Sequence, residues 1–185
     1  ITFMSKFELI SKKQYIKDFK TTEGYEDLLL PKRATRYSAG YDFFSTKEFF
    51  LEPKETIKIP TGVRVKLDKD KFLMVVPRSS IGFKCRMQLD NTVGIIDADY
   101  YESDNEGHIW IKITNDSNNC EILHVEKGAA LAQGIILKYN LTEDDCTTRT
   151  RNGGLGSTDK KPNQLEGQME IFKDLDVKEP ITLSK

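Results

Sequence analysis

The chain has 185 residues, of which 38% are apolar and 31% are charged, and its 28 Lys and Arg against 29 Asp and Glu leave a formal net charge of −1. With a mean hydropathy of −0.51, these values favour one soluble globular domain over a disordered chain. No apolar run reaches the roughly 18 residues of a membrane span. The balanced charge argues against a protein that coats a nucleic acid polymer.

The N-terminal half combines short helices with alternating strands. A helix is predicted after Ser11, with a buried face formed by Tyr15, Ile16 and Phe19. Apolar and polar residues alternate over 57–67 around a turn at Gly62, and a continuous apolar run follows at 72–76, so both stretches are interpreted as strands. Ser79 and Ser80 are good N-cap residues and predict a helix whose single apolar face carries Ile81, Cys85 and Leu89.

Strands also dominate the C-terminal half as far as residue 138. Alternation predicts strands at 109–114 and 122–125, and a short apolar run predicts another at 135–137. The pattern is typical of an all-β barrel or sandwich. The segment 147–163 is rich in Gly, Ser, Thr and basic residues and is expected to be a flexible arm. Asn163 could cap a last helix with an apolar stripe formed by Leu165, Met169 and Phe172.

The cysteines predict a reducing environment. Cys85, Cys120 and Cys146 stand far apart and are odd in number, which disfavours a disulfide framework, and the absence of a Cys-x-x-Cys pair disfavours zinc. The N-terminus shows no secretion signal, and Met4 is a plausible native start. A cytoplasmic location is therefore expected.

A candidate anion site follows the strand at 72–76. Arg78, Ser79 and Ser80 stand where this strand ends and a helix begins, so backbone N–H groups, two hydroxyls and a guanidinium can converge on one anion. The alternative interpretation of these residues is a capped helix with a surface arginine.

The segment 91–100 is a second candidate. Its apolar residues flank a glycine turn, which predicts a hairpin whose open edge could pair with a planar base as another strand would. Asp97 and Asp99 stand two apart in an extended strand and would share a face. Paired carboxylates can hold a metal ion or activate a water, although two carboxylates in a surface turn can also be without function.

A third candidate lies at 149–158, where Arg149 and Arg151 precede three glycines. Glycines let the backbone wrap a phosphate chain, and Arg, Ser and Thr can donate hydrogen bonds to it. The spacing is not that of a P-loop. A flexible linker is the alternative interpretation.

The order of these sequence motifs along the chain identifies a family more specifically than any single motif does. Together with residues 38–42 and 132–136, they resemble the five motifs of the trimeric dUTPase family, in the family's order, from about Leu30 to Thr158. Residues 31–35, before the first motif, are also similar to those of many family members.

The resemblance implies a jelly-roll-like β-barrel subunit, a homotrimer, and hydrolysis of dUTP to dUMP and pyrophosphate with Mg²⁺. Asp97 resembles the acidic residue that activates the attacking water, and Tyr100 resembles the tyrosine beneath the deoxyribose. Asp42 matches the carboxylate that organises metal-bound waters. The remaining implied substrate-binding residues are Arg78, Ser79, Ser80, Asn91, Gly94, Ile96, Gln133, Arg149, Arg151, Leu155, Gly156, Ser157 and Thr158.

The sequence departs from the family at three places. Leu155 stands where an aromatic residue usually stacks on the uracil, so that stacking contribution is missing. The usual arm arginine aligns near Thr150, between Arg149 and Arg151, which leaves open which of the two contacts phosphate. After Tyr100, an acidic link at 101–108 is longer than in the family and is expected to be a surface loop.

The implied organisation is a barrel domain at 1–146, a phosphate-binding arm at 147–161, and a tail at 162–185 whose role is unknown. Two alternative functions stay open at this point. One is a dCTP deaminase of the same fold, and the other is a dUTPase-like regulator that binds nucleotide.

Overall fold

A computed structural model describes residues 5–118, 121–149 and 151. Its elements, in chain order, are β1 (Lys6–Leu9), α1 (Lys12–Phe19), the 3-10 turn η1 (Tyr25–Asp27), β2 (Tyr41–Phe44), β3 (Phe49–Leu51), β4 (Thr56–Pro60), β5 (Val63–Lys66), β6 (Lys71–Pro77), α2 (Ser79–Cys85), β7 (Met87–Leu89), β8 (Gly94–Asp97), the 3-10 turn η2 (Ala98–Glu102), β9 (Trp110–Asn115), β10 (Leu123–Val125) and β11 (Ala130–Lys138).

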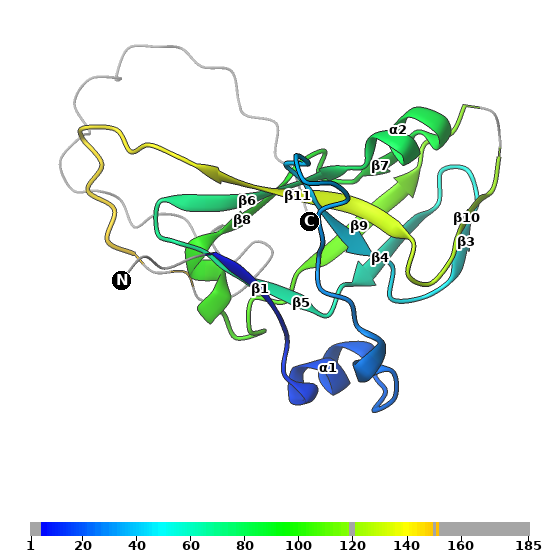
Figure 1. The fold of residues 1–185 in the computed structure, drawn as a ribbon, viewed down its shortest axis with the longest axis horizontal. Coiled ribbons are helices and arrows are strands. Elements are labelled where there is room, and N and C mark those ends of the chain that lie inside the picture. Colours follow the sequence, from blue (N-terminus) through cyan, green and yellow to red (C-terminus); the bar gives the residue numbers. More distant parts are fainter. Residues whose placement is uncertain (1–4, 119–120, 150, 152–185) are drawn as a thin grey trace, which may run out of the picture.

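These strands form four antiparallel sheets around one core. The largest has the order β2-β11-β6-β8, the next is β4-β9-β7, and two pairs, β1-β5 and β10-β3, complete the set. In Figure 1, α1 lies beneath the β1–β5 pair, on the other side of the molecule from α2. Buried residues from all four sheets pack together, among them Phe43, Ile59, Leu73, Ile113 and Leu131.

The predicted all-β fold is confirmed, and each predicted strand is present. Over 109–114, for example, Ile111 and Ile113 of β9 are buried while Lys112 between them is exposed, as period-two alternation requires. Among the described residues the four sheets do not join into one continuous hydrogen-bonded barrel.

The helix after Ser11 is confirmed, but its predicted buried face is only partly right. The Ser11 hydroxyl caps α1 by accepting from the Gln14 N–H. Tyr15 is buried, whereas Ile16 is 45% exposed. Tyr15 and Phe19 stack on each other one turn apart. Ile16 lies about 100° further round the helix, so it faces solvent.

The second helix is shorter than predicted. Helix α2 ends at Cys85, because Arg86 adopts a left-handed conformation with φ 48°. The chain then continues as β7, which pairs with β9, so Leu89 belongs to a strand and not to the helical face. The described residues therefore contain two short α-helices, α1 and α2. The helix predicted after Asn163 lies outside the described residues.

Candidate functional site

The end of β6 gathers the first group of predicted residues. Arg78 follows this strand directly, and its Nε lies 3.0 Å from Asp42 Oδ1 on β2. Ser79 and Ser80 form the exposed first turn of α2 next to it. A guanidinium and two hydroxyls thus lie together, as the prediction of an anion site requires.

Gln133 joins this group because β11 runs between β2 and β6. In the sheet register it lies beside Asp42 on one side and Val76 on the other. Its side-chain amide donates to the carbonyl of Pro77 at 3.3 Å. A Cβ at Gly40 would clash with Gln133 Oε1, so a glycine leaves the space that this side chain occupies. We call Asp42, Arg78, Ser79, Ser80 and Gln133 the Arg78 cluster.

The second group lies on and after β8. This strand pairs with β6 and is an edge of its sheet, with Gly94 beside Val75 and Asp97 beside Phe72. The predicted hairpin at 91–100 is wrong in one respect. Strands β7 and β8 flank the turn but belong to different sheets, because β7 pairs with β9 instead. Within the described part of the chain no strand pairs with the other edge of β8, which leaves that edge available to a planar ligand.

Asn91, Gly94, Ile96, Asp97 and Tyr100 form what we call the Asp97 cluster. Asn91 is exposed, and a Cβ at Gly94 would lie 3.6 Å from its side-chain nitrogen. Ile96 is partly buried and packs against the core. Asp97 ends the strand with its side chain 42% exposed, so its carboxylate is open to water.

Asp97 and Asp99 share one partner, the guanidinium of Arg151. Arg151 pairs with Asp97 through Nη2, and its Nε lies 3.5 Å from Asp99 Oδ1. Its backbone N–H also donates to Asp99 at 3.2 Å. Arg149 is exposed. Of the two candidate arginines, Arg151 is therefore the one held at the Asp97 cluster in this chain.

Tyr100 is held by its hydroxyl. This group donates to the carbonyl of His108 at 2.9 Å and accepts from the side-chain amide of Asn105 at 2.7 Å. Burial raises the pKa of the phenol above its usual value, so the hydroxyl stays protonated and remains a donor.

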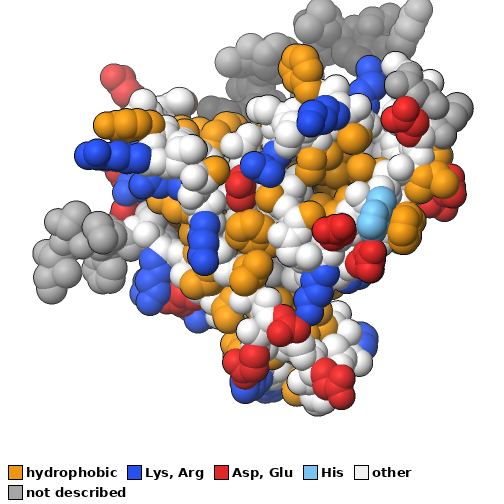
Figure 2. Space-filling view, turned by 45° about the vertical axis from the view of Figure 1, so that its right-hand side comes forward, with side chains coloured by type: hydrophobic (Ala, Val, Ile, Leu, Met, Phe, Trp, Pro, Cys, Tyr) orange, Lys and Arg blue, Asp and Glu red, His pale blue; other side chains and the backbone are white. Residues whose placement is uncertain are grey.

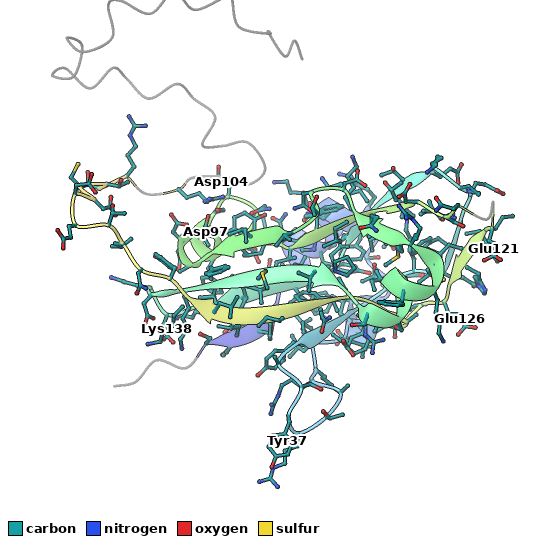
Figure 3. All side chains as sticks on the ribbon, turned by 90° about the horizontal axis from the view of Figure 1, so that it is seen from above. Tyr37, Asp97, Asp104, Glu121, Glu126 and Lys138 are labelled. Carbon is teal, nitrogen blue, oxygen red and sulfur yellow. The ribbon has the colours of Figure 1, made fainter. Side chains whose placement is uncertain are left out.

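The link at 101–108 is not the surface loop expected from the sequence. Ser103 and His108 are buried, at 5% and 0% exposed, and Gly107 lies against the backbone of Tyr100. Asp104, labelled in Figure 3, remains exposed. Local sequence carries no signal for the burial of His108, because its partner Asp18 is 90 residues away in the sequence.

Asp97 and Arg78 lie at opposite ends of β6. Asp97 is beside Phe72 near the start of that strand, whereas Arg78 follows its last residue. At about 3.3 Å per residue, six residues of strand separate the two positions by about 20 Å. Figure 3 shows Asp97 at the end of the sheet near Lys138, away from α2. Within one chain, the Asp97 carboxylate and the Arg78 guanidinium therefore do not come together.

No group of three or more His, Cys, Asp or Glu side chains suited to a metal ion occurs within the described residues. Asp42 is a single carboxylate already paired with Arg78. One carboxylate suits an ion that is held chiefly by water and by ligand oxygens. Leu155, Gly156, Ser157 and Thr158 lie outside the described residues.

The surface has no dominant sign of charge on the face seen in Figure 2, where basic and acidic side chains are interspersed with apolar ones. In the part of the chain that the structure describes, no helix is both long enough and apolar enough to cross a membrane.

The family model and the curated relatives that match this chain agree with each other. The sequence model of the dUTPase family matches residues 26–159. The deoxyuridine 5′-triphosphate nucleotidohydrolase of Lactococcus lactis is 34% identical over 148 residues, covering 77% of this chain and 97% of the relative. That of Dictyoglomus turgidum is 34% identical over 142 residues, covering 72% and 92%.

Solved structures show the same relationship. The dUTPase of Streptococcus mutans superposes with a TM-score of 0.60 at 32% identity, covering 74% of this chain and 98% of that one. A mutant dUTPase of the S. aureus phage phi11, 22% identical, shares the fold with a TM-score of 0.59 over 80% of this chain and 98% of that one. That phage structure describes the coordination of a structural Mg(II) ion.

Proposed function

The chain belongs to the dUTPase family and is a dUTP diphosphatase that hydrolyses dUTP to dUMP and pyrophosphate, and we propose that Asp97 is its catalytic base. The observation that carries the proposal is the placement of Asp97. Its exposed carboxylate ends the edge strand β8, three residues before the half-buried ring of Tyr100. Neither the geometry nor the comparisons favour the dCTP deaminase alternative.

In the proposed reaction, the Asp97 carboxylate accepts a proton from a water molecule as that water attacks the α-phosphorus. A new P–O bond forms to the water oxygen, and the bond from the α-phosphorus to the bridging oxygen of the β-phosphate breaks. Pyrophosphate leaves and dUMP remains. Fixing the carboxylate at a strand end limits its motion, which favours a productive alignment.

The other members of the Asp97 cluster bind the nucleoside in this proposal. Asn91 and the unpaired backbone edge at Gly94 and Ile96 pair with the uracil edge, where a 5-methyl group would not fit. Tyr100 packs beneath the deoxyribose, where a 2′-hydroxyl would clash. Its hydroxyl is engaged with the carbonyl of His108, which fixes the orientation of the ring.

The Arg78 cluster binds the phosphates. The Arg78 guanidinium and the hydroxyls of Ser79 and Ser80 are donors suited to phosphate oxygens. Gln133 adds an amide. We expect Mg²⁺ to be held chiefly by the triphosphate, with Asp42 contacting it through water, and when bound it neutralises phosphate charge.

The distance between Asp97 and Arg78 supports a homotrimer. The catalytic base and the phosphate-binding arginine must act on the same triphosphate, yet Asp97 and Arg78 stand about 20 Å apart along β6 of one chain. A site that combines the Arg78 cluster of one subunit with the Asp97 cluster of another removes this conflict.

The arm at 147–161 completes the site in this proposal, with Arg149, Arg151, Leu155 and the Gly156, Ser157 and Thr158 segment closing over the bound nucleotide. The barrel domain is 1–146, and the tail at 162–185 has no assigned role. The cytoplasmic location stays a prediction.

The decisive experiment offers dUTP, dCTP, dTTP and UTP separately with Mg²⁺ and measures both pyrophosphate and ammonia. Pyrophosphate from dUTP alone is expected. Ammonia from dCTP would indicate the deaminase, and tight binding of dUTP without turnover would indicate a regulator. Omission of Mg²⁺ should lower turnover of dUTP, and sedimentation should give three times the mass of the chain.

A further inference from the structure

The N-terminal segment, residues 5–25, precedes the region matched by the family's sequence model, which begins at residue 26. It is nevertheless folded onto the barrel. Strand β1 pairs with β5 along its whole length, and the N–H of Ile10 donates to the carbonyl of Gly62 at 3.0 Å. This segment therefore places α1 against a specific part of the body.

That part is the 101–108 link. The backbone N–H and the hydroxyl of Ser11 donate to the Glu106 carboxylate at 2.8 and 2.6 Å. From the other end of the helix, Asp18 Oδ2 lies 2.6 Å from Nδ1 of His108. Helix α1 thus holds the link at two points.

The contact between Asp18 and His108 is a directed hydrogen bond. The N–H of Gly62 donates to His108 Nε2 at 2.9 Å, so this nitrogen carries no proton. The ring proton of the neutral imidazole is then on Nδ1, which donates to Asp18. His108 is fully buried, and Gln14 donates to the same Asp18 oxygen at 2.8 Å. The ring therefore has one orientation.

The same histidine contacts the substrate-binding side of the link. Its carbonyl accepts from the Tyr100 hydroxyl, while Asn105 donates to that hydroxyl. Gly107, at φ 68°, lies so close that a Cβ there would be 2.8 Å from the carbonyl oxygen of Tyr100. The link thus wraps tightly around Tyr100, and its outer side is held by α1.

We propose that Asp18 and His108 are positioning residues for Tyr100, through which α1 sets the enzyme's discrimination between deoxyribose and ribose. The inference rests on the proposed role of Tyr100 against the sugar. Neither Asp18 nor His108 contacts the nucleotide. They act by fixing the carbonyl to which the Tyr100 hydroxyl is bonded.

The test is the ratio of kcat/KM for dUTP to kcat/KM for UTP. In Asp18→Ala the ratio should fall by about 10- to 100-fold, since misplacing a substrate contact by about 1 Å costs up to this much. Asp18→Asn retains an oxygen acceptor for Nδ1–H and should restore the ratio. Loss of folding stability alone would not change this ratio in the molecules that remain folded.

Asp27→Ala is the matched control. Asp27 stands just after the N-terminal segment, at the end of η1, and ties this turn to the body through an ion pair with Lys127 at 2.6 Å. Its carboxylate forms no hydrogen bond or ion pair with the described residues of the link. Its removal should leave the ratio unchanged. Should Asp18→Ala fail to fold, Glu106→Ala releases the link from Ser11 at its outer side and should lower the ratio more weakly.

A double-mutant cycle tests whether Asp18 acts through the Tyr100 hydroxyl. Tyr100→Phe removes the hydroxyl, so in that background Asp18→Ala should have no further effect on the ratio. An unchanged ratio in Asp18→Ala and Glu106→Ala, or an equal fall in Asp27→Ala, overturns the inference while leaving the diphosphatase intact. A wild-type chain without dUTP turnover would overturn the proposed function itself, and this inference with it.

Discussion

The two ends of β6 hold their functional side chains in different ways. At its C-terminal end, the Arg78 cluster is supported within one sheet, by the ion pair of Arg78 with Asp42 and by the bond from Gln133 to the carbonyl of Pro77. At the other end, the Asp97 cluster lies on an edge strand and relies on a link that α1 fastens from outside. The phosphate end is thus built from strands within the region that the family's sequence model matches, and the nucleoside end also uses a segment that precedes this region.

The largest effect should come from the nucleoside end. Asp97→Asn removes the proposed base but keeps the shape, so kcat should fall by about 10²–10⁴-fold while nucleotide binding persists. Pyrophosphate release measures kcat, and calorimetry with a non-hydrolysable dUTP analogue measures nucleotide binding. Asp104→Asn, an exposed carboxylate of the nearby link, is the control and should keep its activity. Normal turnover by Asp97→Asn would refute the assignment.

Arg78→Ala examines the phosphate end. It removes a charged donor to phosphate, whose hydrogen bonds are worth about 1.5–3 kcal/mol, so kcat/KM should fall by roughly 10- to 150-fold. The dUTP:UTP ratio should stay constant, because this residue lies at the other end of β6. Arg78→Lys should recover part of the loss, since it restores the charge but not the fork of donors. A changed dUTP:UTP ratio would mean that Arg78 also affects discrimination of the sugar, and it would contradict the separate roles of the two ends of β6.

A fall in pH should weaken the contacts between α1 and the 101–108 link before it affects the rest of the fold. Burial lowers the pKa of His108 below 6.5, against the opposing effects of the Asp18 and Glu106 carboxylates, with Lys58 also lowering it. The unfolded chain then binds the extra proton more readily than the folded chain does. The stability contributed by the neutral ring is present above pH 6.5 and is lost as the pH falls through the lowered pKa.

Thermal melting and hydrogen exchange in α1, followed from pH 7.5 to pH 5, measure this effect. Protection in α1 should decrease before protection in β6 and β11. His124→Gln alters an exposed histidine that pairs with Glu48 and should leave the profile unchanged. A flat profile above pH 5 would contradict the proposed orientation of His108.

The smallest effect should come from Asp27→Ala. The ion pair with Lys127 is more than half exposed at both side chains. Pairs of this kind contribute about 0–1 kcal/mol. Chemical denaturation should therefore show little change, and added salt should reduce even that. A loss of stability well above about 1 kcal/mol would contradict the description of this ion pair as a weak surface contact.

Local patterns in the sequence were sufficient for the strands, whereas the members of both clusters were named from the resemblance to the dUTPase family. Alternation at period two reflects one buried and one exposed side of a strand, so it is readable without tertiary information. Arg78, Ser79 and Ser80 are predicted together as an anion site, and the structure places Gln133, which belongs to a separate motif, beside them.

Only the tertiary structure decided where α2 ends, which strands pair, which residues of the 101–108 link are buried and how far apart the site residues lie. Helix α2 stops at Cys85 because the following residues pair with β9, and the turn after β7 joins two different sheets. The link at 101–108 is buried because Asp18, distant in sequence, bonds to His108. The separation of Asp97 from Arg78 follows from the length and register of β6. Sequence patterns show which residues are apolar and which carry functional groups. The burial of a side chain and the distance between two side chains depend on contacts between segments far apart in the chain.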